Sequence, residues 1–256
     1  MGLLEGKKAL VLGIANDMSI AWGITRALKA EGASIGLTYL NDALKKRVEP
    51  LSEEIGADFL VEMDVTNEDH YEALKKTVQD NWGKFDILVH SLAFADRADL
   101  KGRFHETSRS GFAMACDISA YSLIGLTKAL KEEMNEGGSI MAMTYHGSQQ
   151  VMDGYNVMGV AKAALEASAR YLASDLGVDK IRVNCISAGP IRTLAASGVP
   201  GLKKIFNIIE ERAPLRRNIT TEEVGGTALY LASDLSSGVT GQILYCDSGI
   251  STMATC

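Results

Sequence analysis

Short apolar, β-branched runs alternate along the chain with longer stretches in which apolar residues recur at helical spacing. The apolar runs fall at 7–13, 33–39, 57–65, 85–94, 137–145, 180–189 and 241–249, and the helical stretches at 19–31, 42–55, 67–82, about 109–134, 155–176 and 221–233. Several of these runs are apolar at consecutive positions, which is typical of strands buried on both faces of a parallel sheet. The alternation predicts an α/β fold, a single doubly wound, Rossmann-like domain whose seven-stranded parallel sheet is flanked by helices on both faces.

Residue types that favour helix ends flank these stretches. Thr66 and Asn67 precede the third helical stretch, and Thr220 or Thr221 precedes the last, as expected of N-terminal caps. Glycines follow three of the helices, where the backbone commonly turns left-handed: Gly32, Gly56 and Gly83. The region 190–240 shows no strand pattern and is expected to hold an inserted helical segment.

The composition narrows the class of protein. The chain has 256 residues, is 46% hydrophobic and 23% charged, and carries a formal net charge of -6. The apolar fraction is that of a globular domain, and the acidic balance argues against binding to nucleic acid or to a membrane surface, because both need clustered positive charge. The first residues do not resemble a signal peptide, and no run approaches the roughly 20 apolar residues of a membrane span. We therefore expect a soluble, cytoplasmic protein.

Neither the cysteines nor the histidines form a metal motif. The cysteines lie far apart in the chain, except for the last pair: Cys116, Cys185, Cys246 and Cys256. With no C-x-x-C motif, they are interpreted as buried thiols in a reducing compartment. The spacing of His90, His105 and His146 also matches no metal site, so none is predicted.

The first predicted strand runs into a turn and helix start at 13–23 that contain two glycines. Gly13 is placed to make the tight turn that leaves the strand, and Gly23 to permit close contact between the next helix and the sheet. Ser19 stands where that helix begins, so its hydroxyl and the amides of Ser19 and Ile20 are suited to bind a pyrophosphate. An ordinary turn with a serine cap is the alternative. The position after the first strand favours the cofactor interpretation.

The ends of the second and third strands bear on which dinucleotide binds. An acid after the second strand normally bonds the ribose 2′-hydroxyl, whereas a basic residue accommodates a 2′-phosphate. Here Leu40 is followed by Asn41, which also suits a helix cap, and by a basic cluster at 45–47 that is typical of a solvated helix face. After the third strand, Asp64 and Val65 are placed to meet an adenine ring, with a capping role as the alternative for Asp64.

Tyr155 and Lys162 form the strongest chemical pattern in the sequence. They are seven residues apart on one predicted helix, so both side chains lie on one face, about 10.5 Å apart along its axis. An ammonium near a phenol lowers the pKa of the phenol and makes it a competent donor to a developing oxyanion. The alternative is a core tyrosine and a surface lysine, which most arbitrary pairs of this kind are. Small residues between the two, including Gly159, leave room for close packing.

Most of the chain resembles the short-chain dehydrogenase/reductase superfamily, and specifically the enoyl-[acyl-carrier-protein] reductases of bacterial type II fatty-acid synthesis. The shared motifs are G-I-A-x-x-x-S-I-A-x-G at 13–23, F-D-x-x-V-H-S at 85–91, Asp117-Ile118-Ser119, Tyr155-Asn-Val-Met-Gly with Lys162, and the run 182–195 from Arg-Val-Asn to Ile-Arg-Thr-Leu-Ala. The last block is the most specific of these motifs.

Three departures separate the sequence from ordinary short-chain dehydrogenases. The spacing from Tyr155 to Lys162 is three residues longer, His90-Ser91-Leu92-Ala93 replaces Asn-Asn-Ala-Gly, and Tyr145 stands in the place of the catalytic serine. The longer spacing and Tyr145 resemble the machinery that reduces a carbon–carbon double bond conjugated to a thioester. One departure is from the enoyl reductases themselves, because Leu40 stands where relatives often carry a polar or basic residue.

The resemblance implies reduction of trans-2-enoyl-[acyl-carrier-protein] to the saturated thioester, with NADH as the hydride donor. NADPH is the less favoured donor, and it stays an alternative because Leu40 leaves the choice of cofactor open. It implies Tyr155, Lys162 and Tyr145 as catalytic residues, and Ala95 with the two tyrosines as contacts of the substrate. The cofactor residues that it implies are Gly13, Ser19, Ile20, Leu40, Asp64, Val65, Leu92, Lys162, Ile191, Thr193, Leu194 and Ala195.

The resemblance also implies a substrate-binding helical segment at about 194–212, within a single reductase domain over 1–256, and a homotetramer. Lysines in that segment suit an acidic carrier protein, with a solvated helix face as the alternative. Two other functions stay open at this point. They are a carbonyl reductase of the same superfamily, which the spacing from Tyr155 to Lys162 disfavours, and a non-catalytic dinucleotide sensor, which the presence of both residues disfavours.

Overall fold

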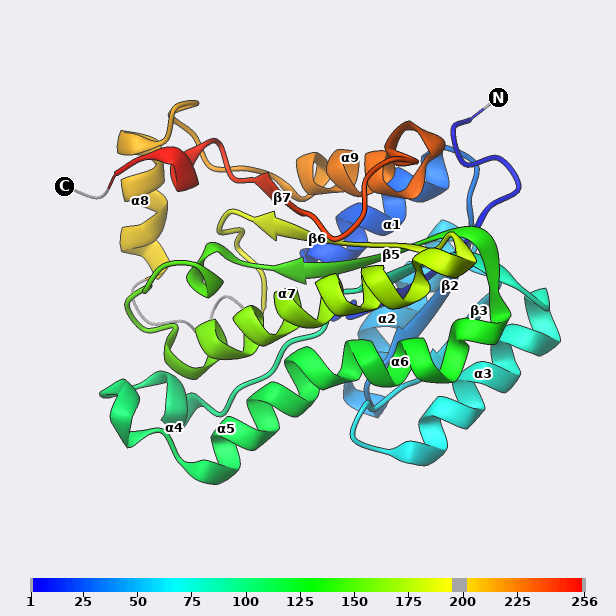
Figure 1. The fold of residues 1–256 in the computed structure, drawn as a ribbon, viewed down its shortest axis with the longest axis horizontal. Coiled ribbons are helices and arrows are strands. Elements are labelled where there is room, and N and C mark those ends of the chain that lie inside the picture. Colours follow the sequence, from blue (N-terminus) through cyan, green and yellow to red (C-terminus); the bar gives the residue numbers. More distant parts are fainter. Residues whose placement is uncertain (1, 195–201, 255–256) are drawn as a thin grey trace.

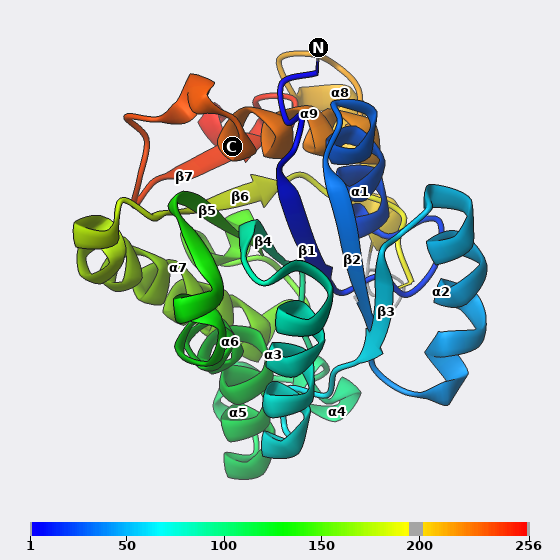
Figure 2. The same ribbon diagram turned by 90° about the vertical axis from the view of Figure 1, so that its right-hand side faces the viewer.

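A parallel sheet of seven strands, in the order β3-β2-β1-β4-β5-β6-β7, organises the molecule. The computed structural model describes residues 2–194 and 202–254. The strands are β1 (Lys8–Leu12), β2 (Ser34–Tyr39), β3 (Phe59–Glu62), β4 (Phe85–His90), β5 (Met134–Thr144), β6 (Arg182–Ala188) and β7 (Ile243–Cys246). The order reverses between β1 and β4, and this is the switch point at which doubly wound sheets open a crevice beyond the carboxyl ends of their strands. The predicted fold class is confirmed (Figures 1 and 2).

Helices cover both faces of the sheet. They are α1 (Ile20–Ala30), α2 (Asp42–Ile55), α3 (Glu68–Trp82), α4 (Arg97–Leu100), α5 (Arg109–Cys116), α6 (Ser122–Leu130), α7 (Asn156–Leu176), α8 (Leu202–Arg212) and α9 (Thr221–Ala232). One hydrophobic cluster joins α1, α2 and α9 to the sheet, and a second joins α3, α6 and α7 to its other face. Figure 2 shows α1 and α9 on one side of the strands and α3, α6 and α7 on the other.

The long helix predicted over 109–134 is continuous but irregular. A π-helical segment, Asp117–Tyr121, joins α5 to α6, and a 3-10 turn at Lys131–Glu133 leads directly into β5 at Met134, rather than at 137. The runs predicted at 57–65 and 241–249 form shorter strands, β3 and β7. Both lie at the edges of the described sheet, and their flanks continue as loops. The short helix α4 was not predicted.

The predicted helix ends are largely confirmed. The Asn67 side chain caps α3 by accepting from the Asp69 amide at 3.0 Å, and Thr220 forms a capping box with Glu223 at α9. The three glycines after helices all have positive φ: Gly32 at +96°, Gly56 at +61° and Gly83 at +71°. None of the described helices is long and apolar enough to span a membrane.

The prediction that Gly23 permits close contact between its helix and the sheet is wrong. A Cβ at this position would lie 2.5 Å from the Cβ of Thr221 and 2.6 Å from its carbonyl oxygen. Gly23 therefore permits close contact between α1 and α9, not between α1 and the sheet. Gly225 on α9 repeats the arrangement from the other side, because its Cβ would lie 2.8 Å from the Gly23 oxygen.

The described cysteines are only partly as predicted. Cys185 is buried in β6, while Cys116 and Cys246 are half-buried, and all three are free thiols. Burial raises the pKa of the Cys185 thiol to about 12, as expected for an inert core residue. Cys256 lies outside the described residues.

Candidate active site

A cavity of about 650 Å³ opens beyond the carboxyl ends of β1, β4, β5 and β6 and is completed by α4 and the first turns of α7. In Figure 1 the arrows of β5 and β6 point toward this end of the molecule, where α4 and α8 lie. We call it the central cavity. Most of the residues predicted for cofactor and substrate line it: Gly13, Ser19, Ile20, Leu92, Ala95, Tyr145, Tyr155, Lys162, Ile191, Thr193 and Leu194. Leu40, Asp64 and Val65 are not part of this lining, and Ala195 lies outside the described residues.

The turn after β1 is tightly built. Gly13 has a φ of +100°, and a Cβ there would lie 2.1 Å from the Ser91 carbonyl oxygen. The Ser19 hydroxyl accepts hydrogen bonds from the amides of Ala15 at 3.0 Å and Asn16 at 3.1 Å, and the Ser19 amide donates to the Asn16 carbonyl at 3.1 Å. The turn itself thus uses the Ser19 amide as a donor, and the role of Ser19 in anion binding stays a prediction. Among the described hydrogen bonds, the Ile20 amide has no partner and remains for a ligand at the N-terminus of α1.

The ends of β2 and β3 lie beside the cavity rather than in it. Leu40 is 44% exposed, and Asn41 caps α2 by accepting from the Leu44 amide at 3.1 Å, so the capping alternative is confirmed for Asn41. Asp64 accepts two hydrogen bonds on one oxygen from Thr66, at 2.9 Å from its amide and 2.7 Å from its hydroxyl. This turn fixes the loop after β3 and leaves the second carboxylate oxygen of Asp64 without a described partner.

Lys162 lies at the bottom of the cavity, and its side chain is buried. Its ammonium donates to the carbonyl oxygen of Met143, near the end of β5, at 2.7 Å. It also donates to the carbonyl oxygen of Leu92, in the loop after β4, at 3.4 Å. Burial lowers the pKa of Lys162 to about 8, while the nearby Cys185 and Glu166 act in the opposite direction. The alternative of a surface lysine is thereby excluded.

The two tyrosines stand together in the cavity wall. The rings of Tyr145 and Tyr155 are 5.0 Å apart between centroids, in an edge-on arrangement with planes inclined by 69°. Burial raises the pKa of Tyr145 to about 12 and also raises the pKa of Tyr155, to which Tyr145 and Glu166 contribute further. The prediction that Lys162 lowers the pKa of Tyr155 is wrong for this structure, since the described hydrogen bonds of the ammonium go to backbone carbonyls. Both phenols are held protonated, as hydrogen-bond donors.

Two glycines permit the close packing around Tyr155. A Cβ at Gly147 would lie 2.5 Å from Cδ1 of Tyr155, and a Cβ at Gly159 would lie 2.7 Å from the Gly147 carbonyl oxygen. The turn after β5 therefore packs directly on the start of α7. The room that small residues leave between Tyr155 and Lys162 is used for this contact.

The chain matches known proteins over nearly its whole length. The family model described as "Enoyl-(Acyl carrier protein) reductase" matches residues 13–251. The chain belongs to this family. A relative from Rhizobium meliloti (strain 1021), named enoyl-[acyl-carrier-protein] reductase [NADH] 1, is 53% identical over 98% of the chain and 93% of the relative. The resemblance found in the sequence is confirmed.

Solved structures of enoyl-acyl carrier protein reductases superpose on the chain. The Bacillus cereus protein, crystallised with NADP+ and an indole naphthyridinone, has a TM-score of 0.97 at 49% identity and covers 100% of both chains. The Anaplasma phagocytophilum protein, in complex with NAD, has a TM-score of 0.95 at 46% identity and covers 99% of this chain and 97% of its own.

The residue that sequence reasoning missed in this enoyl reductase is Glu166. It lies four residues after Lys162 on α7 and is 1% exposed, and it accepts hydrogen bonds from Thr144, Ser148 and Gln149. Helical spacing alone places it on the same face of α7 as Lys162, so a carboxylate on that apolar face was an available signal. His90, also buried, lies 2.7 Å through Nε2 from the Ser122 hydroxyl; burial lowers its pKa to about 3, which keeps it neutral.

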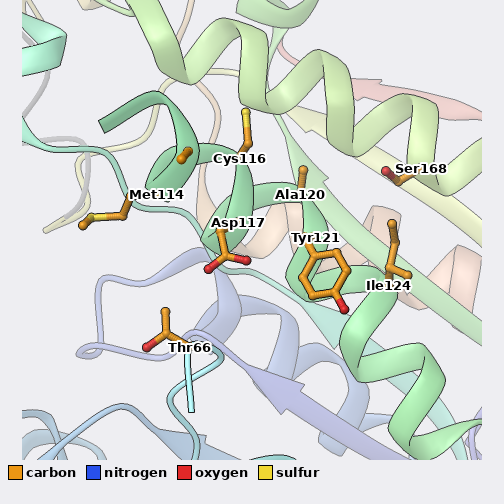
Figure 3. A pocket seen from close by; sticks show the side chains of 9 residues that line it. Thr66, Met114, Cys116, Asp117, Ala120, Tyr121, Ile124 and Ser168 are labelled. Carbon is orange, nitrogen blue, oxygen red and sulfur yellow. The ribbon is translucent and has the colours of Figure 1, made fainter. Parts of the chain in front are cut away.

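A second hollow lies on the outside of the reductase, along α5 and α6. It has a volume of about 830 Å³, and we call it the α5–α6 groove. Its lining is formed by Thr66, Ala113, Met114, Cys116, Asp117, Ala120, Tyr121, Ile124 and Ser168. Figure 3 shows Thr66 facing this helical row from the loop before α3, and Ser168 facing it from α7. Met114 and Tyr121 are 44% and 49% exposed, so the groove presents apolar surface to solvent rather than a set of buried polar groups.

Proposed function

We propose that this chain reduces the carbon–carbon double bond of trans-2-enoyl-[acyl-carrier-protein] to the saturated acyl thioester, using NADH. The observation that carries the proposal is the meeting of Tyr145, Tyr155 and buried Lys162 at one wall of the central cavity. Two protonated phenols beside an apolar cavity suit an oxygen that gains negative charge, and they supply no nucleophile or metal ligand.

The cavity residues fit a dinucleotide. At Gly13 the backbone comes so close to Ser91 that no side chain can stand there, and the adjacent Ile20 amide is unpaired among the described hydrogen bonds. We assign Gly13, Ser19 and Ile20 to the pyrophosphate, and Leu92, Ile191 and Thr193 to the nicotinamide end. Asp64 and Val65 are assigned to the adenine, and Leu40 to the adenosine ribose. When bound, the nicotinamide supplies the hydride.

Tyr155 is assigned as the main hydrogen-bond donor to the thioester oxygen, with Tyr145 as a second donor. Since burial raises the pKa of both phenols, each keeps its proton across the physiological range. Donors that are already oriented stabilise a developing oxyanion without reorganising in the transition state, which is typically worth about 3 kcal/mol for one donor.

Lys162 is assigned to the nicotinamide ribose. With a pKa of about 8, its ammonium is charged at neutral pH, and the carbonyls of Met143 and Leu92 hold it against the cavity floor. It contributes positive potential and orientation rather than proton transfer. Ala95, in the loop between β4 and α4, is assigned to the acyl thioester because it lines the same cavity.

Partners and assembly form the outer part of the proposal. We expect the segment 194–212, which includes α8 and the exposed Lys204, to receive the acidic acyl carrier protein. We also expect a homotetramer in which a second copy covers the exposed apolar side chains of the α5–α6 groove. The cytoplasmic location stays a prediction, which cell fractionation tests.

The deciding experiment follows NADH absorbance with a crotonyl thioester and, separately, with a 3-ketoacyl thioester. Turnover of the crotonyl substrate alone is expected. Turnover of the keto substrate alone would instead identify a carbonyl reductase, and NADH binding without turnover of either would identify a sensor. Replacing NADH with NADPH in the same assay tests the cofactor choice at Leu40, and we expect NADH to give the higher kcat/KM.

A further inference from the structure

Glu166 is a buried carboxylate that the proposed chemistry does not use. It lies on α7, one helical turn beyond Lys162, and is 1% exposed. Burying a carboxylate is costly unless hydrogen bonds replace the lost water. Among the described ion pairs, none includes Glu166. Its charge is therefore held by hydrogen-bond donors rather than by a basic partner.

The three donors come from one short segment on either side of Tyr145. Thr144, the residue before Tyr145, donates its hydroxyl to one carboxylate oxygen at 2.7 Å, and Ser148 donates to the same oxygen. Gln149 donates its side-chain amide to the other oxygen at 2.5 Å. The carboxylate thus closes residues 144–149 into a loop whose first, fifth and sixth residues are fixed to α7, and Tyr145 lies within that loop.

Titratable groups from several elements face this carboxylate. They are Lys162 and Tyr155 at the start of α7, Cys185 on β6 and Tyr245 on β7, and Glu166 acts on the pKa of each by its negative charge. Arg170, one turn further along α7, acts on the same Cys185. His146 lies inside the 144–149 loop, with its ring 5.7 Å from that of Tyr245. Of the charged groups named here, Lys162 is the one assigned to the reaction.

We propose that Glu166 is a positioning residue, which holds Tyr145 in the cavity wall through the 144–149 loop and places negative charge beside Lys162. The proposal rests on the roles assigned above to Tyr145, Tyr155 and Lys162. It explains why a carboxylate occupies a buried helical position where an apolar residue would pack at lower cost. Glu166 touches neither substrate nor cofactor in this assignment.

The test compares Glu166→Gln with Glu133→Gln. Glu133 is a control for buried carboxylates, because it is 5% exposed and accepts a hydrogen bond from Gln79 at 2.8 Å. Unlike Glu166 it also pairs with a lysine, Lys75, at 3.7 Å, and it precedes β5 at the opposite end of the sheet. We expect Glu166→Gln to lower kcat about tenfold, with KM for NADH changed less than about twofold, because supporting residues typically contribute on this scale. Glu133→Gln is expected to lower the melting temperature and leave kcat unchanged.

The pH profile separates a positioning role from a merely structural one. The profile of kcat/KM reports ionisations of the free enzyme, and the alkaline limb is expected to follow Lys162, whose pKa is about 8. Glu166 raises that pKa, so its neutral replacement is expected to move the alkaline limb to lower pH. Thr144→Val removes one donor and keeps the charge, so it is expected to lower kcat without moving the limb. If Glu166→Gln does not fold, Thr144→Val still tests the positioning role through its effect on kcat.

The outcomes separate this inference from the proposed function. If Tyr155→Phe loses turnover while Glu166→Gln keeps kcat and the same alkaline limb, the positioning role is refuted and the proposed function stands. If Glu166→Gln lowers kcat only in proportion to its loss of folded protein, with an unmoved limb, the role is structural and the inference is again refuted. If wild type turns over no enoyl thioester, the proposed function itself fails.

Discussion

The central cavity and the α5–α6 groove differ in chemistry. The α5–α6 groove has a volume of about 830 Å³ and the central cavity one of about 650 Å³. The groove exposes apolar side chains such as Met114 and Ile124 on the outside of one helical row. The central cavity instead brings buried Lys162 together with half-buried Tyr155, where four strands end.

The difference shows what identifies a catalytic site. Covering exposed apolar surface with any complementary surface is favourable, so the groove is suited to contact with a partner. A buried ammonium beside two half-buried phenols is costly to fold, and such groups persist where they perform chemistry. The following predictions test this division, beginning with the largest expected effect.

Tyr155→Phe removes one hydroxyl from the central cavity and is expected to lower kcat by about 100-fold or more, the usual cost of losing an oxyanion donor. Binding of NADH, measured by fluorescence titration, is expected to change little. Tyr171→Phe is the matched control, since Tyr171 lies on the same helix but is 81% exposed. Equal turnover of the two variants would contradict the assignment of Tyr155.

Gly13→Ala tests the cofactor end of the same cavity. The new Cβ would lie 2.1 Å from the Ser91 oxygen at a φ of +100°, so the turn must shift. We expect KM for NADH to rise about tenfold, because a backbone displacement near the pyrophosphate costs on the order of 1.4 kcal/mol.

Gly6→Ala provides the control for backbone strain at Gly13. Gly6 also has a positive φ, +77°, but no atom lies within 4 Å of an added Cβ. It is expected to lower the melting temperature slightly and leave KM unchanged. If both variants raised KM alike, the clash at Ser91 would not be the cause.

Tyr121→Asp tests the groove. Tyr121 is 49% exposed and lines the groove together with Asp117, so a second carboxylate there disfavours burial by another copy. We expect sedimentation to show weaker association, with a smaller loss of kcat than Tyr155→Phe produces. A variant that sediments like wild type would exclude this groove as the interface between copies.

The parallel sheet was predictable because its strands are apolar at consecutive positions. Val11, Leu88 and Ile140 lie inside such runs and are fully buried in the structure. The placement of Tyr155 was predictable only in part. Lys162 lies on α7 as predicted, but Tyr155 precedes the helix as its N-cap and is followed by Asn156 at a φ of +40°, so regular helical geometry does not set their separation. Local periodicity therefore accounts for most of the fold and for Lys162, but not for the turn that places Tyr155.

The contacts that local periodicity did not predict join distant parts of the chain. Glu166 meets Thr144 and Gln149 only because the turn after β5 folds back on α7. Gly23 packs against Thr221 because α1 and α9 lie side by side on one face of the sheet. Burial likewise determines the ionisation of Tyr155, and the extent of burial follows from the whole fold rather than from the spacing to Lys162.

Lys162→Met is expected to change how stability depends on pH. The folded pKa of Lys162, about 8, lies below its ordinary value of 10.5, so between these values the unfolded chain binds more protons and wild type gains stability as pH rises. The raised pKa values of Tyr145, Tyr155 and Cys185 act in the opposite sense at high pH, but these residues are present in both proteins. We therefore expect denaturant unfolding to show that, from pH 8 to pH 10, the free energy of unfolding rises more, or falls less, in wild type than in Lys162→Met. The expected difference is on the order of 2 kcal/mol. Parallel pH dependences in the two proteins would mean that Lys162 is not held in a desolvated site, and the contrast with the solvent-exposed groove would be lost.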